Sequence, residues 1–292
     1  EVDVDASQMS NYLDAHQQQL RDAGQIKTQA QPHLNRLTET LKGGKAFNWL
    51  PDVDYSQRTR QQPNSSRCIH EYKFSPATLA GLQSLSKQHR VTPYVTGMAL
   101  FGLMVACHSD AEVFHIYSPN GGRSQAEFAN TLGLFLNWNI YQLDMSSELS
   151  LSELIQALKG QYYAHVEPNF PHLKLIKAHL SDLPIKQLSY GIQSYNEQTT
   201  MAQQMADKTG KAVEIDYYVP PFIEAKQDLS FYLVDQWGDL YGAFTYNTEL
   251  FNHRSMVKME KTFDAMVAYF VDDAKRKTTI KLLRAEQLRE AS

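Results

Sequence analysis

The sequence has few cysteines and no long apolar run. Cys68 and Cys107 are the only two cysteines in 292 residues, and 42% of the residues are hydrophobic, so a core can form without a disulfide framework. No apolar segment approaches the roughly 18 to 20 residues of a membrane span, and no signal-peptide pattern opens the chain. These absences favour a cytoplasmic globular protein, of one large or two modest domains, with no membrane partner.

An excess of basic charge is also missing. The 28 basic and 32 acidic residues give a formal net charge of −4, and no basic stripe runs along any predicted element. Proteins that bind nucleic acid neutralise phosphates with clustered Lys and Arg side chains. The composition therefore excludes nucleic acid as an expected partner.

Several catalytic signatures do not occur. No Gly-x-Ser-x-Gly sequence is present, which argues against an α/β-hydrolase. Asn120, Gly121 and Gly122 lack the further glycines of a dinucleotide or phosphate-binding loop, so we expect a plain turn. His108 and Asp110 are two residues apart, a spacing that favours a helix end over a catalytic dyad.

One histidine series could suggest a metal site. His165, His172 and His179 recur every seven residues, which would place three ligands on one face of a continuous helix. Pro168 and Pro171 interrupt that helix. We therefore expect scattered surface and half-buried histidines and no bound metal.

The first third of the chain predicts connecting elements. Residues 1–45 are polar and helix-forming, and they predict two helices with breaks at Gly24, Pro32 and Gly43–Gly44. Residues 46–66 contain two prolines and predict an extended surface crossing.

The remainder alternates between helix and strand patterns, which predicts a mixed α/β fold. Residues 93–107 are apolar nearly all round and predict a buried helix. Cap signals mark four helix starts: Ser75 before Pro76, Thr92 before Pro93, Ser150 with Glu153, and Asn252. Strands are expected over residues 67–74, 112–118, 132–143, 188–196, 212–219, 229–236 and 240–247. The last two form a hairpin through Trp237, Gly238 and Asp239.

Two segments resemble motifs of a known family. LGLFLNWNIYQL, residues 132–143, is similar to Gly-x-Phe-Val-Asn-Thr, with Gly133, Phe135 and Asn137 in matching places and Trp138 where threonine is usual. AHVEPNFPHLKLI is similar to His-Gln-Asp-x-Pro-Phe-Glu, with His165 matching. Together they resemble the condensation domain of nonribosomal peptide synthetases.

Other segments follow the order of that family. NYLDAHQQQL resembles Tyr-x-Asp-Tyr-Ala-x-Trp with departures at His16 and Gln17, SYGIQSYN resembles Phe-Asn-Tyr-Gln, and DLSFYLVDQWGDLYGAFTYNTELFN resembles the closing hairpin. The Arg-Asp segment that ends in Asn-Pro-Leu is hardly recognisable in LSDLPIKQL, which leaves the subtype open. The catalytic sequence His-His-x-x-x-Asp-Gly does not occur in these 292 residues.

The resemblance implies an α/β fold of the chloramphenicol acetyltransferase type, whose two lobes enclose a tunnel. Residues 1–46 would then be connecting helices from the N-terminal lobe, and residues 47–276 the C-terminal lobe, a mixed sheet flanked by helices. Residues 277–292 would form a linker to a following domain.

The resemblance also implies an acyltransferase that joins a thioester donor to an amine acceptor in antibiotic or siderophore biosynthesis. The activity is expected only when the N-terminal lobe supplies the histidine motif. Peptidyl or aryl carrier proteins would present both substrates on phosphopantetheine, with no cofactor bound directly. A non-catalytic carrier-binding lobe, a cyclisation or epimerisation domain, and an acyltransferase that uses coenzyme A remain open.

No catalytic residue is assigned within these residues. The resemblance places five polar candidates along the tunnel: Asn137, Tyr195, Asn196, Ser230 and Asn247. Gly133, Phe135 and His165 are expected to be structural. For the polar candidates, a structural hydrogen bond is the alternative role.

Overall fold

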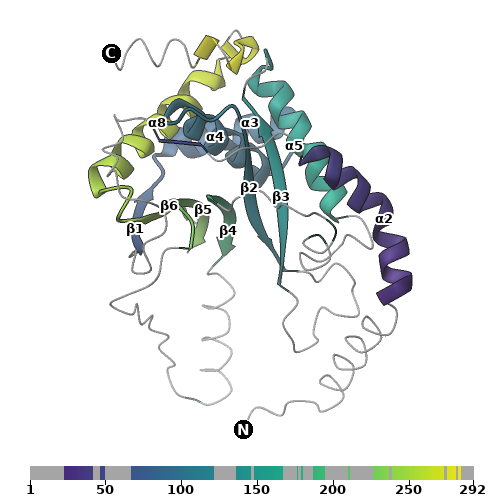
Figure 1. Cartoon of the computed structure of the whole chain (residues 1–292). Coiled ribbons are helices and arrows are strands. Elements are labelled where there is room, and N and C mark those ends of the chain that lie inside the picture. The colour runs from purple at the N-terminus through teal and green to yellow at the C-terminus, as the bar shows by residue number, and fades with distance from the viewer. Residues whose placement is uncertain are drawn as a thin grey trace.

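The structure is a computed structural model centred on one sheet. It describes residues 23–41, 47–49, 67–121, 136–145, 148–166, 176, 179, 187–194, 210, 226–236, 239–272, 275–280 and 282–283. The sheet has six strands in the order β1-β6-β5-β4-β2-β3 (Figure 1). The strands are β1 (Arg67–Lys73), β2 (Val113–Asn120), β3 (Asn137–Asp144), β4 (Leu188–Ser194), β5 (Leu229–Gln236) and β6 (Asp239–Asn247).

Strand pairing confirms the predicted mixed sheet. β4 pairs in parallel with both β2 and β5, and the β1–β6, β5–β6 and β2–β3 pairs are antiparallel. The predicted closing hairpin is therefore present as β5 and β6. The predicted strand at residues 212–219 lies outside the described residues.

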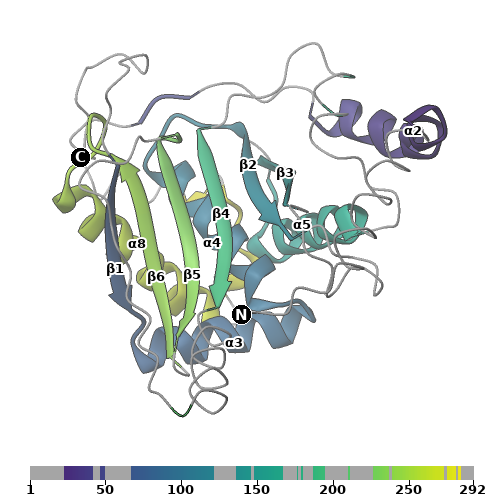
Figure 2. The same ribbon diagram turned by 90° about the horizontal axis from the view of Figure 1, so that it is seen from below.

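Helices flank the sheet as the sequence predicts. They are α2 (Ala23–Thr40), α3 (Pro76–His89), α4 (Pro93–Cys107), α5 (Leu151–Val166) and α8 (His253–Val271), followed by the short 3₁₀ helix η3 (Lys275–Lys277). Figure 2 shows α3, α4 and α8 behind the strands β1, β6, β5 and β4. The apolar helix α4 is buried from Val95 to Cys107, which confirms the prediction for residues 93–107.

Three of the four predicted caps form hydrogen bonds. The amide of Thr78 donates to Ser75 Oγ at 3.0 Å, and that of Ser255 donates to Asn252 Oδ1 at 3.0 Å. The Ser150 amide donates to a carboxylate oxygen of Glu153 at 2.8 Å, as a capping box requires. Thr92 lies at the N-cap of α4 but its side chain makes no cap hydrogen bond.

The predicted helix break at Pro32 is wrong, because α2 continues through this residue. α2 begins at Ala23, next to the predicted break at Gly24, and the predicted break at Gly43–Gly44 lies outside the described residues. A proline inside a helix costs about 3 kcal/mol. Leu34, Leu37 and Leu41 are buried against β2 and β3, and each fully buried leucine contributes about 1.5–3 kcal/mol. Tertiary burial thus outweighs the local cost of the proline.

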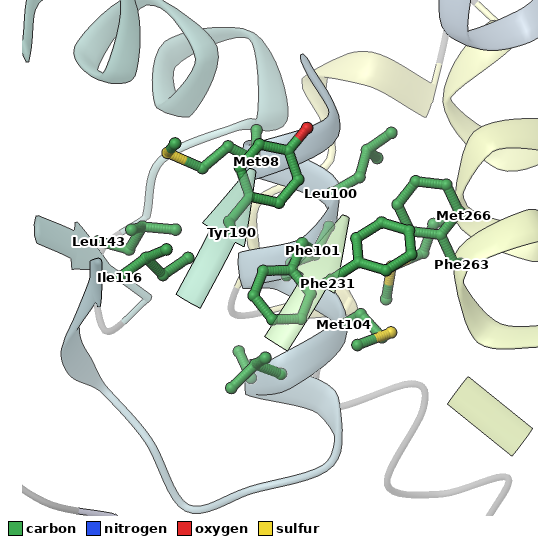
Figure 3. Packing of buried hydrophobic residues seen from close by; sticks show 14 of the residues in the cluster. Met98, Leu100, Phe101, Met104, Ile116, Leu143, Tyr190, Phe231, Phe263 and Met266 are labelled. Carbon is green, nitrogen blue, oxygen red and sulfur yellow. The ribbon is translucent and has the colours of Figure 1, made fainter. Parts of the chain in front are cut away.

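The main core lies between the sheet and the helices. Phe101, Tyr190, Phe231 and Phe263 have no exposed surface. The ring centroid of Phe231 lies 5.5 Å from that of Phe101 and 5.1 Å from that of Phe263, so side chains of α4, β5 and α8 meet at one point (Figure 3).

The predicted surface crossing and the predicted C-terminal linker both pack into this core at their described residues. Phe47 and Trp49 are 5% and 4% exposed, so the predicted surface crossing is wrong where it begins. Ile280 and Leu283, from the polar C-terminal segment, are 1% and 5% exposed. The Ile280 amide donates to the Leu149 carbonyl at 2.8 Å, which fixes this segment beside the start of α5.

No single helix in the described ranges is long and apolar enough to cross a membrane. Only α3 and α4 taken together meet that requirement of length and composition, and they are bent by 109° at their junction.

Candidate functional site

Four tyrosines from four elements converge between the sheet and the helices. They are Tyr94 of α4, Tyr141 of β3, Tyr162 of α5 and Tyr190 of β4, called here the tyrosine cluster. The ring centroids of the other three lie 6.5, 5.7 and 5.3 Å from that of Tyr94. Polar hydroxyl groups are thus placed inside a region that otherwise continues the apolar core.

Three hydroxyls of this cluster, those of Tyr94, Tyr141 and Tyr190, are held in the neutral form by burial. Burial raises the pKa of Tyr94, Tyr141 and Tyr190 above the usual value of a tyrosine. The Tyr94 hydroxyl lies 2.5 Å from Ser118 Oγ on β2. The buried Tyr190 hydroxyl has no hydrogen-bond partner among the described residues, and Figure 3 shows it pointing away from the phenylalanine rings of the core.

Gly97 of α4 makes room for the Tyr190 hydroxyl. A Cβ atom at position 97 would lie 2.4 Å from that oxygen, closer than any real contact. A larger residue in α4 would therefore displace Tyr190 and disturb the cluster.

Gly97→Ala is expected to lower the free energy of unfolding by about 1–3 kcal/mol, because it overpacks this contact. Tyr190→Phe in the same chain should restore part of the loss, since it removes the clashing oxygen. Gly160→Ala in α5 is the matched control, because a Cβ at this position would meet no atom within 4 Å and alanine favours the helix by about 1 kcal/mol. Equal effects of the two glycine substitutions in urea unfolding would contradict the assignment.

Asn137 begins β3 on the same face as this cluster. It pairs with Asn120 of β2, and its Oδ1 accepts a hydrogen bond from the Trp138 amide at 2.8 Å. Alternation along the strand places Asn137, Asn139 and Tyr141 on one face, toward α4. Asn137 therefore extends the polar surface of the tyrosine cluster along β3.

Ser230 lies on the opposite face of the sheet, since it is next to the core residue Phe231. It is buried and accepts a hydrogen bond from Ser189 Oγ at 2.9 Å. Two strands, β2 and β4, separate β3 from β5, so the structure does not bring Ser230 and Asn137 together.

Asn247 ends β6 in a turn. Its Oδ1 accepts a hydrogen bond from the Glu249 amide at 2.9 Å, which is the geometry of a structural residue. Tyr195 and Asn196, and the motif residues Gly133 and Phe135, lie outside the described residues.

His165 is buried beside Tyr141 of the tyrosine cluster and does not lie at the surface. It is 4% exposed, and its ring centroid is 4.6 Å from that of Tyr141. Burial lowers its pKa to about 4, so the imidazole is neutral near pH 7. His172 lies outside the described residues, and the part of the chain that is described contains no group of three metal-ligating side chains.

The pair His108 and Asp110 does not form a dyad. His108 Nε2 lies 3.0 Å from Thr262 Oγ1 of α8. The Asp110 carboxylate instead accepts from the amide and the side chain of Asn48, at 2.7 and 3.0 Å. α4 ends at Cys107 with His108 at its C-cap, which confirms the prediction of a helix end.

The sequence did not single out the tyrosine cluster. Its members Tyr94, Tyr141, Tyr162 and Tyr190 are separated by 47, 21 and 28 residues in turn, and they belong to no shared motif. The available signal was weak: a tyrosine directly after the helix-starting Pro93, and a glycine, Gly97, inside a helix that is otherwise apolar.

The sequence matches the family described as "Condensation domain" from residue 3 to residue 290. It is 26% identical over 234 residues to a linear gramicidin synthase protein of Brevibacillus parabrevis, covering 77% of this chain and 4% of that protein. It is 25% identical over 209 residues to tyrocidine synthase 3 of the same organism, covering 68% of this chain and 3% of that protein. The chain thus spans a small part of the curated relatives that it matches.

Solved structures share the fold. A condensation domain from the monacolin K polyketide synthase superposes with a TM-score of 0.68 at 11% identity, over 92% of this chain and 62% of the other. A four-domain nonribosomal peptide synthetase bound to AMP and glycine gives a TM-score of 0.68 at 20% identity, over 84% of this chain and 19% of the other. These similarities confirm the predicted fold of the chloramphenicol acetyltransferase type.

Proposed function

Because this chain belongs to the condensation-domain family of nonribosomal peptide synthetases, we propose that it is the C-terminal lobe of a domain that forms amide bonds. The single observation that supports this is the family match from residue 3 to residue 290, which takes in every described helix and strand. Peptidyl or aryl carrier proteins would deliver the donor thioester and the acceptor amine on phosphopantetheine arms.

In the proposed reaction the acceptor nitrogen attacks the donor thioester carbonyl. The C–N bond forms, the C–S bond breaks, the donor arm leaves as a thiol, and the amine loses one proton. A histidine would assist the loss of that proton. None of the 10 histidines in these 292 residues is adjacent to another, so the family's histidine pair would come from an N-terminal lobe.

This lobe would then contribute to the reaction by positioning the two substrates. Holding two carrier-bound arms near attack distance replaces a bimolecular collision, which can contribute about 7–11 kcal/mol to lowering the barrier. In this proposal the hydroxyl of Tyr94, which is hydrogen-bonded to Ser118, and the side chain of Asn137 would offer hydrogen bonds to a substrate along this wall. The missing histidine pair also favours a second candidate, a non-catalytic lobe that binds carrier proteins.

An amide-forming assay separates the two candidates. The chain is combined with an N-terminal lobe that contains His-His-x-x-x-Asp-Gly and with two aminoacylated carrier proteins, and the product on the acceptor arm is measured by mass spectrometry. We expect product only when both lobes are present, and a loss of about two- to tenfold in Tyr94→Phe, the effect of one hydrogen bond. Tyr163→Phe on the exposed face of α5 is the control.

Product at an equal rate from the 292-residue chain alone would contradict the family mechanism. Carrier binding without any product in the presence of the N-terminal lobe would favour the non-catalytic lobe.

A further inference from the structure

A short segment of the chain is hydrogen-bonded to the residues that precede β4 and β5. The segment is Phe47–Trp49, and the two side chains that hold it are Gln187, immediately before β4, and Asp228, immediately before β5. All four of the residues Phe47, Trp49, Gln187 and Asp228 are at most 7% exposed. We call this arrangement the clasp.

Gln187 holds Phe47 in the way that a neighbouring β-strand would. Its Nε2 donates to the Phe47 carbonyl at 3.2 Å, and its Oε1 accepts from the Phe47 amide at 3.2 Å. The side-chain amide thus satisfies both backbone groups of one residue. A residue without an amide at position 187 would remove both of these hydrogen bonds from a buried segment.

Asp228 joins this amide to Trp49. Its Oδ2 accepts from Gln187 Nε2 at 3.0 Å and lies 3.4 Å from Trp49 Nε1, the indole donor. The backbone amide of Asp228 donates to the Gln187 carbonyl at 2.9 Å, so the two strand starts are also joined to each other. The clasp therefore couples the crossing segment to the spacing of β4 and β5.

Further contacts fix Asn48 and Trp49 of the same segment. The Trp49 ring packs edge-on against Phe251, with centroids 4.8 Å apart. Asn48 exchanges backbone and side-chain hydrogen bonds with Asp110 beyond the end of α4, including one from the Asp110 amide to the Asn48 carbonyl at 3.0 Å. The segment is thus anchored to a helix end as well as to the sheet.

We propose that Gln187 and Asp228 are positioning residues that lock Phe47–Trp49 and so fix how the chain that precedes residue 47 is held against this lobe. The functional part of this inference rests on the proposed function, because in a two-lobed domain the preceding chain leads to the lobe with the histidine motif. Locking the connection would keep the two tunnel walls at a constant spacing. The clasp would therefore act on the rate of the bound complex rather than on carrier binding.

Hydrogen exchange of the protein as it is expressed tests the clasp directly. In Gln187→Leu we expect the Phe47 amide to exchange at least about tenfold faster, because it loses the acceptor Gln187 Oε1. Exchange that is tenfold faster means that the equilibrium constant for local opening rises about tenfold. The amides of Tyr190 and Phe231 should keep their protection. Gln83→Leu, an exposed glutamine on α3, is the matched control.

Conservative variants keep the test decisive. Asp228→Asn retains an acceptor for Trp49 and should preserve both the exchange of Phe47 and the NMR shift of the Trp49 indole proton, whereas Asp228→Ala should change both. If Gln187→Leu does not fold, the shorter Gln187→Asn should still release Phe47. Unchanged Phe47 exchange in the folded Gln187 variants would overturn the clasp.

The proposed effect of Gln187 on catalysis is measured separately. In the two-lobe assay we expect Gln187→Asn to lower kcat about two- to tenfold with the KM for carrier proteins unchanged. A rise in KM alone would overturn the positioning role. If the unsubstituted protein gives no product while Phe47 exchange still responds to the variants, the proposed function fails and the clasp stands.

Discussion

Phe231→Ala is expected to lower the free energy of unfolding of this chain by about 3–5 kcal/mol, the usual cost of truncating a fully buried phenylalanine. Phe231 has no exposed surface, and its ring lies 4.6 Å from that of Phe244 and 5.1 Å from that of Phe263. Truncation leaves a cavity where β5, β6 and α8 meet. Since domains are typically stable by only about 5–15 kcal/mol, the variant should unfold at much lower urea concentration.

The control for this substitution is Tyr163→Ala on α5, because Tyr163 is 56% exposed. Surface substitutions of this kind usually change stability by less than about 0.5 kcal/mol. A Phe231→Ala variant that loses no more stability than Tyr163→Ala would contradict the central place of Phe231 in the core.

Stability is expected to fall as the pH is lowered from 7.5 toward 4, because two histidines are buried in the neutral form. Burial lowers the pKa of both His115 and His165 to about 4. In the unfolded chain their pKa is about 6.5, so below that pH the unfolded state binds protons that the folded state does not. Each histidine should lower the free energy of unfolding by about 1 kcal/mol between pH 7.5 and 5.5, and by more as the pH approaches 4.

Carboxylates also titrate as the pH falls, so the effect of the histidines is measured by comparing histidine variants with the unsubstituted chain. In His165→Gln the free energy of unfolding should fall less steeply between pH 7.5 and 5.5 than in the unsubstituted chain, and His115→Gln should behave in the same way. His253→Gln is the control, since this residue is exposed at the start of α8. Parallel pH profiles for all four proteins would show that His115 and His165 are not buried as neutral groups.

Local signals in the sequence predicted most of the described secondary structure. The cap residues Ser75, Ser150 and Asn252 begin helices where predicted, because a side chain that satisfies the first free amide acts within one turn. The apolar surface of α4 likewise determined its burial. These effects depend on neighbouring residues, which the sequence displays directly.

Features that depend on distant residues were not predicted. Pro32 was expected to end a helix, and only the packing of α2 on β2 and β3 shows why it does not. The burial of Trp49 depends on Asp228, 179 residues later in the chain. For the candidate site, Asn137 was found through a family motif, whereas Tyr190 of the tyrosine cluster was not, because no local pattern marks a cluster of hydroxyls that only the tertiary fold brings together.

The native mass of this chain mixed with an N-terminal lobe that contains the histidine motif would show whether the two form one domain. We expect a 1:1 complex, because the chain is proposed to be one wall of a two-lobed domain. A monodisperse monomer of the 292 residues that unfolds cooperatively and does not bind that lobe would contradict it.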